Sequence, residues 1–184
     1  KALAETECEI WAHRFGKLIY WTLSSERQRA HDHLRKAFGQ TLSSEQIQRI
    51  ALEVFQNLTF NLFECLRFRG LDDKRLIKKI EVKGWEHVEA VHRAGQGGIF
   101  VTGHIGNWEI SAAYVAMRGY PIHVVARRIY LKPLDRRLIQ MRERMGVKTL
   151  YRDIPMRPMV RRLQMNQFLG ILPDQDVRKV GGIF

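Results

Sequence analysis

The stretch VTGHIGNWEIS, residues 101–111, places a histidine between two glycines directly after an apolar run. Imidazole is the side chain best matched to general-base chemistry near neutral pH. To act as a base it needs one ring nitrogen facing the substrate and the other held by an orienting group, commonly a carboxylate. Glu109 lies five residues after His104, so the two can meet only if the chain bends between them, which Gly103 and Gly106 permit. The alternative is an ordinary strand-to-helix corner at which His104 bonds to backbone.

A second candidate group is basic. Twelve Lys and Arg and only three acidic residues lie in residues 127–162, so this segment carries +9 of the chain's net charge of +12. Such a balance calls for an anionic partner: nucleic acid, anionic lipid or a phosphorylated substrate. Many of these cations are expected to form solvated helix faces. Arg127 and Arg128, however, follow an apolar run, and guanidinium groups grip phosphate well. Few aromatics interleave with the cations and no nucleic-acid-binding motif occurs, which disfavours nucleic acid.

A third group is the acidic pair in LPDQD, residues 172–176. Asp174 and Asp176 could hold a magnesium ion, orient an arginine or cap a loop. Because no further ligand clusters with them in the sequence, we favour orientation and expect no metal and no cofactor.

The sequence offers no evident protein nucleophile beside His104. The two cysteines, Cys8 and Cys65, lie far from this region and have no metal or redox spacing. Ser111 lacks the strand-turn-helix setting of an activated serine. A base without a protein nucleophile implies that the substrate brings its own.

The pattern of apolar residues predicts an α/β fold with a mixed, largely parallel sheet flanked by helices, preceded by a helical N-terminal segment. Residues 1–79 are expected to be helical: Ser43 and Gln46 have capping-box spacing, and Ile47, Ile50, Val54, Leu58 and Leu62 mark one helix face. Beyond them, strands expected at 80–83, 99–102, 122–126, 147–151 and 168–172 alternate with helices at 85–93, 107–118, 134–145 and 156–167. Functional groups gather where parallel strands end, so the three candidate groups are expected to converge.

We therefore divide the chain into an N-terminal helical segment, 1–79, packing on an α/β core, 80–184. The sequence begins with Lys and ends on an apolar run, so we expect a fragment whose core continues beyond residue 184. It contains no run of about eighteen apolar residues, the length a transmembrane helix needs. Residues 10–21 mix aromatics with cations, which suits either a membrane interface or a helix packed on its own core.

The ordered motifs resemble a known family. GHIGNWE, residues 103–109, is similar to the His-x4-acid block of the lysophospholipid acyltransferase-like superfamily, and is closest to its late (lauroyl or myristoyl) lipid A acyltransferases. LKPLDR, residues 131–136, resembles that branch's NPLLD stretch, with Lys132 at the usual Asn. GILPDQD, residues 170–176, and the final GIF continue the likeness, which covers roughly residues 45–184.

The resemblance implies a glycerolipid acyltransferase-like fold and transfer of a fatty acyl group from acyl carrier protein to a hydroxyl of a lipid A precursor. The reaction would occur at the cytoplasmic face of the bacterial inner membrane. His104 would be the general base, Glu109 would orient it, and the substrate-binding residues would be Asn107, Arg127, Arg128, Asp174 and Asp176. A glycerophospholipid or phosphatidylinositol-mannoside acyltransferase is the alternative enzyme. A basic module that binds anionic lipid or nucleic acid is the non-enzymatic one, and activity of the fragment alone stays open.

Overall fold

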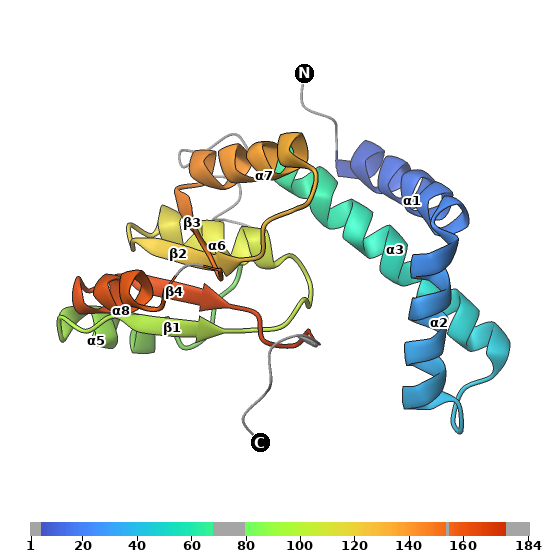
Figure 1. Ribbon diagram of the computed structural model, residues 1–184, viewed down its shortest axis with the longest axis horizontal. Coiled ribbons are helices and arrows are strands. Elements are labelled where there is room, and N and C mark those ends of the chain that lie inside the picture. Colours follow the sequence, from blue (N-terminus) through green and yellow to red (C-terminus); the bar gives the residue numbers. More distant parts are fainter. Residues whose placement is uncertain (1–4, 68–79, 154, 176–184) are drawn as a thin grey trace. The chain divides into compact units, whose positions relative to one another are not determined.

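The computed structural model describes residues 5–67, 80–153 and 155–175 (Figure 1). The chain forms two compact units, residues 1–67 and 68–184. The division expected at residue 79 falls at the end of residues 68–79, which lie outside the described part of the chain.

The described residues of the first unit form three helices, α1 (Glu5–Thr22), α2 (Ser24–Phe38) and α3 (Ser44–Arg67). The predicted capping box is confirmed at the start of α3. The Ser43 hydroxyl accepts a bond from the Gln46 N–H at 3.2 Å, and the Gln46 side-chain oxygen accepts one from the Ser43 N–H at 2.7 Å. These two bonds satisfy N–H groups that a helix terminus otherwise leaves unpaired.

Helix α1 has both an inward and an outward apolar face. Cys8, Ala12 and Tyr20 are buried within the unit, whereas Leu18 and Trp21 are more than half exposed. The helix therefore packs on its own unit and still presents aromatic and aliphatic side chains to solvent. No helix within the described ranges has the length and apolar content needed to cross a membrane.

The buried face of α3 differs from the predicted one. The buried side chains include Ile47, Ala51, Phe55 and Thr59. Val54, Leu58 and Leu62, which the periodicity placed on the inner face, are exposed by 42 to 53%. The face toward α1 thus consists of residues spaced four apart along the helix. The apolar residues of the neighbouring row lie beside this face and are exposed to solvent.

The second unit is built on a four-stranded sheet of order β1-β4-β2-β3, in which every pairing is parallel (Figure 1). The strands are β1 (Gly98–Val101), β2 (Ile122–Ala126), β3 (Val147–Tyr151) and β4 (Phe168–Ile171). Helices α5 (Trp85–Arg93), α6 (Trp108–Met117), α7 (Lys132–Arg144) and α8 (Arg157–Gln164) alternate with them. The α/β class is confirmed. The strand expected at 80–83 was wrong: Ile80 to Lys83 forms neither strand nor helix.

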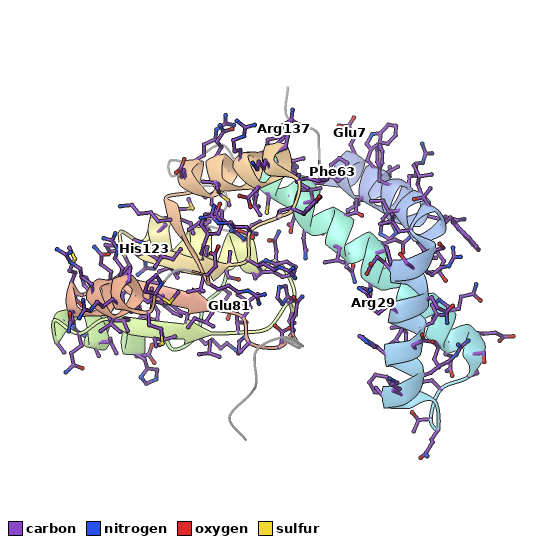
Figure 2. The ribbon with its side chains drawn as sticks, viewed as in Figure 1. Glu7, Arg29, Phe63, Glu81, His123 and Arg137 are labelled. Atoms are coloured by element: carbon purple, nitrogen blue, oxygen red, sulfur yellow. The ribbon has the colours of Figure 1, made fainter. Side chains whose placement is uncertain are left out.

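The core of this unit lies between α6 and the sheet. Ala113 and Val115 of α6 pack with Val124, Val147 and Phe168 from three strands. His123, labelled in Figure 2, is 1% exposed, and its Nε2 is paired with the Gln167 side-chain oxygen at 2.8 Å. Burial lowers the pKa of this imidazole. His123 is thus a neutral core residue and does not line the cavity described below.

Candidate active site

His104 follows β1, and its partner is a carboxylate 70 residues away. Asp174, which follows β4, accepts two hydrogen bonds from this one residue. Its Oδ2 lies 2.7 Å from the His104 backbone nitrogen, and its Oδ1 lies 2.8 Å from ring atom Nδ1. The two side chains meet because β1 and β4 are adjacent parallel strands whose carboxyl ends coincide. The His104 ring also stands edge-on to Trp108, with centroids 4.7 Å apart.

The charge state of Asp174 fixes the arrangement of protons on His104. The backbone N–H of His104, and then its ring, hold the pKa of the Asp174 carboxyl below its usual value. The carboxylate is therefore ionised at neutral pH and can only accept hydrogen bonds. Nδ1 must then carry the proton it donates, so a ring that holds a single proton has the lone pair of Nε2 free to take another.

Gly103 leaves room for this contact. A Cβ added there would lie 3.1 Å from Oδ2 of Asp174 and 3.4 Å from its Cγ. Gly106, with φ of 59°, makes the turn that precedes α6. The glycines permit a bend, as the sequence indicated, but the close approach that Gly103 allows is to Asp174.

Gly103→Ala is expected to displace the Asp174 carboxylate by a few tenths of an ångström, because that side-chain end is the neighbour most able to move. We expect kcat of the full-length protein to fall by up to about 10²-fold, the scale that small misplacements of a reacting group produce. Steady-state kinetics measure this, and the thermal unfolding midpoint should stay close to wild type. Unchanged kcat in a folded variant would contradict it.

The structure does not show the expected pairing of Glu109 with His104. Glu109 instead forms a two-point ion pair with Arg142 of α7: its Oε2 accepts from Nε at 2.8 Å and its Oε1 from a terminal nitrogen at 2.6 Å. The side chains are 12% and 10% exposed, respectively. Glu109 lies in the first turn of α6, and both oxygens of its carboxylate bind Arg142 of α7. It ties α6 to α7 and does not contact the imidazole.

Three of the residues expected to bind substrate have other contacts in the structure or lie outside it. The Asn107 side-chain oxygen accepts the Ile110 N–H at 3.3 Å and caps α6. Arg128 donates through Nε to Asp153 at 3.2 Å and lies 3.7 Å over the ring of Tyr151. Asp176 falls outside the described residues. Arg127 and Asp174 do lie at the strand ends where they were expected.

A cavity of about 540 Å³ runs from these strand ends toward the core between α6 and the sheet. Its polar mouth is lined by His104, Glu109, Arg127, Arg142, Arg152 and Gln175. Its walls are apolar and include Phe100, Ala112, Val115, Ile122, Val124 and Gly170. The predicted convergence of the ends of three strands is therefore observed, and the groups converge on an apolar pocket.

Two residues of this site were missed by sequence reasoning. Arg142 was counted only as part of a basic run, and no local pattern marks it as the partner of Glu109. Arg152 directly follows β3, so the same strand-end rule that singled out Arg127 would have found it. The rule was applied to three strands and not to the fourth.

The fold and the site together define a class. A parallel α/β sheet carries, at its carboxyl edge, a histidine held by an ionised carboxylate at the mouth of an apolar cavity. That is a site equipped for general-base chemistry beside a pocket for an apolar group.

Comparisons with known proteins agree with this class of protein. The chain belongs to the bacterial lipid A biosynthesis acyltransferase family, whose model matches residues 3–184. It is 26% identical over 122 residues to a phosphatidylinositol mannoside acyltransferase of Mycolicibacterium smegmatis, covering 64% of this chain and 40% of that protein. It is 25% identical over 124 residues to one of Mycobacterium tuberculosis, covering 64% and 39%. The chain thus spans about two fifths of the length of these curated relatives, and the family resemblance seen in the motifs is confirmed.

Proposed function

We propose that the full-length protein transfers a fatty acyl group from acyl carrier protein to a hydroxyl of a lipid A precursor. The observation that carries this proposal is the His104–Asp174 pair at the mouth of the apolar cavity. The family match supports the lipid A acceptor. The cavity has the apolar walls that a fatty acyl chain requires.

In the proposed reaction His104 acts as general base and Asp174 keeps the ring in the productive tautomer. Nε2 takes the proton of the acceptor hydroxyl as its oxygen attacks the thioester carbonyl carbon. A C–O bond forms, the C–S bond breaks, and the thiolate of the carrier leaves with the proton that the imidazolium returns. Glu109 serves as a positioning residue: paired with Arg142, it joins the two helices that carry part of the cavity mouth.

A second acceptor is supported by the two mycobacterial relatives, which are named as phosphatidylinositol mannoside acyltransferases. The chemistry at His104 would be the same, since a sugar hydroxyl would attack the same thioester. The two candidates therefore differ in the acceptor and share the site.

The proposal includes action at the cytoplasmic face of the inner membrane. It is supported by the outward face of α1, where Trp11, Leu18 and Trp21 are exposed and Arg14 lies over the Trp11 ring. Amphipathic aromatics and cations favour a membrane interface.

The test is acyl transfer by the purified full-length protein, with acylated carrier protein as donor and mass spectrometry of the lipid product. We expect a lipid A precursor to gain the mass of one acyl chain, and His104→Ala to give none above background. Acylation of phosphatidylinositol mannoside alone would favour the second acceptor. If His104→Ala matched wild type, or if the protein bound these lipids without acylating either, the enzymatic proposal would fail.

A further inference from the structure

Two arginines at the cavity mouth have no counter-charge among the residues that the structure describes. Arg127 and Arg152 both line the cavity, both are exposed, and neither guanidinium has a hydrogen bond or ion pair within the part of the chain that the structure describes. Arg142, the third arginine of the mouth, is paired with Glu109. The acidic residue that lines the cavity, Glu109, is already paired with Arg142, so the lining offers these two guanidinium groups no free carboxylate.

The sheet register places these two arginines beside each other. Ala126 at the end of β2 pairs with Tyr151 at the end of β3, so Arg127 and Arg152 are the next residues of two neighbouring strands. The Arg152 N–H donates to the Ala126 carbonyl at 3.0 Å and extends the pairing by one step. Two like charges set side by side in this way repel each other unless an anion lies between them.

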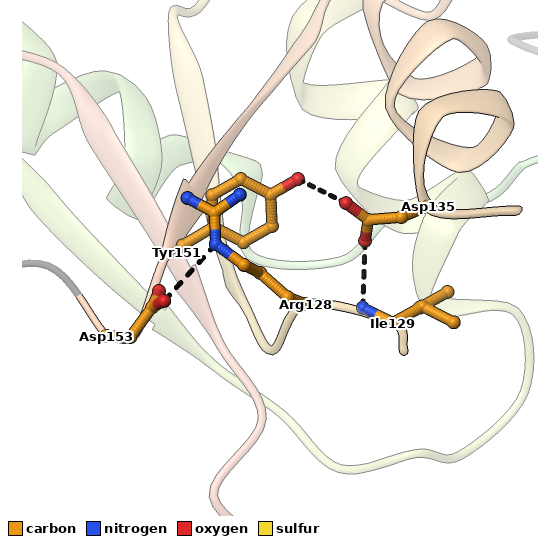
Figure 3. Close-up of polar contacts among 5 residues, drawn as sticks. All are labelled: Arg128, Ile129, Asp135, Tyr151 and Asp153. Atoms are coloured by element: carbon orange, nitrogen blue, oxygen red, sulfur yellow. Dashed lines mark hydrogen bonds and ion pairs between the residues drawn. The ribbon is translucent and has the colours of Figure 1, made fainter. Parts of the chain in front are cut away.

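The residues next to this pair form a bonded cluster that holds it in place, shown in Figure 3. Arg128 lies over the Tyr151 ring and donates to Asp153. The Tyr151 hydroxyl donates to Oδ2 of Asp135 at 2.7 Å, and the Ile129 N–H donates to its Oδ1 at 2.9 Å. The cluster ties the end of β3 to the loop that follows β2.

This cluster accounts for the different roles of adjacent arginines. Successive side chains of an extended segment point to opposite sides. Arg128, Tyr151 and Asp153 meet on one side, so Arg127 and Arg152 are left on the side of the cavity. Two hydrogen bonds, the larger effect from the Ile129 N–H and the smaller from the Tyr151 hydroxyl, hold the pKa of the Asp135 carboxyl below its usual value. Asp135 is therefore ionised at neutral pH and can accept both bonds that hold the cluster together.

We propose that Arg127 and Arg152 together form a preorganised site for a phosphate group carried by one of the two substrates of the proposed reaction. Guanidinium groups match phosphate oxygens in charge and geometry. A phosphate bound at the mouth would fix the position of the substrate that carries it, and so set how that substrate's thioester or acceptor hydroxyl lies relative to His104. The phosphate is either the phosphodiester of the carrier's prosthetic arm or a phosphate of the lipid acceptor. The identity of its bearer rests on the proposed function, whereas anion binding does not.

The first arm of the test measures binding without turnover. The full-length protein is titrated with inorganic phosphate at constant ionic strength while its thermal unfolding midpoint is followed. We expect phosphate to raise the midpoint of wild type, of His104→Ala and of Arg137→Gln/Arg144→Gln, which replaces two exposed arginines of α7 and so removes the same charge outside the cavity. We expect little rise in the Arg127→Gln/Arg152→Gln double variant. Equal stabilisation of this variant and of the Arg137→Gln/Arg144→Gln control would overturn the site.

The second arm identifies the bearer of the phosphate by kinetics. We expect the double variant to raise KM by roughly 10- to 100-fold for the substrate that carries the phosphate, the loss expected for charge-assisted hydrogen bonds. Acylated carrier protein is compared with a short acyl thioester lacking phosphate, and a phosphorylated acceptor with its dephosphorylated form. A KM change seen only with carrier protein assigns the donor, and one seen only with the phosphorylated acceptor assigns the lipid. KM unchanged for every substrate would overturn the proposal even where wild-type acyl transfer is observed.

Discussion

Replacing Asp174 by asparagine in the full-length protein is expected to lower kcat for acyl transfer by about 10²–10⁴-fold, the contribution of a correctly oriented general base. The asparagine side-chain oxygen can still accept the hydrogen bond from the His104 backbone N–H. Its NH2 group then faces ring atom Nδ1 and can only donate to it. The ring is driven to the tautomer that carries its proton on Nε2, so the atom that should take the substrate proton is blocked. KM for either substrate should change little, because no substrate contact is removed.

Steady-state kinetics on five variants decide this prediction. His104→Ala should lose as much as Asp174→Asn or more, and the double variant should lose no more than His104→Ala, because the two residues act as a unit. Glu143→Gln, which removes an exposed acid from α7, is the matched control and should retain wild-type kcat. If Asp174→Asn kept its turnover while a folded Glu109→Gln variant lost it, the pairing expected from the sequence would be restored and the one in the structure contradicted.

The sequence was sufficient to place His104 but not to choose its partner. An apolar run followed by glycines located the strand end, and the alternation of strands and helices located three others. The choice between Glu109 and Asp174 depended on which strand lies beside β1, and that neighbour proved to be β4, the last of the described strands. A contact across 70 residues follows from strand order, whereas a five-residue spacing is visible locally and favoured Glu109, which the structure pairs with Arg142.

The same limit applies to the arginines. The sequence pattern indicated that Arg127 and Arg128 follow a strand, and it predicted that both bind phosphate. Which of two adjacent side chains points into the cavity depends on the tertiary contacts of the other, here the Tyr151 ring and Asp153. The helix periodicity of α3 failed for a related reason, since a row of apolar residues marks an amphipathic helix without fixing which row a neighbouring helix covers.

The largest expected effect on stability comes from the pair between α6 and α7. Arg142→Met removes the charge at nearly constant volume and leaves the Glu109 carboxylate, 12% exposed, without its counter-ion. Removing one partner of a buried ion pair costs about 3–5 kcal/mol, because the remaining charge stays desolvated. We expect a loss of that size in the free energy of unfolding, measured by urea denaturation of the full-length protein.

The companion variants separate a stranded charge from simple loss of packing. Adding Glu109→Gln to Arg142→Met should recover part of the lost stability, since the uncompensated carboxylate is then gone and the remaining amide costs less to bury. Arg144→Met, an exposed arginine two residues along the same helix, should change stability by no more than about 0.5 kcal/mol. Equal effects of Arg142→Met and Arg144→Met would show that the pair does not hold α6 to α7. In that case Glu109 would not act as a positioning residue. Its location beside the cavity would instead indicate a direct role in binding or catalysis.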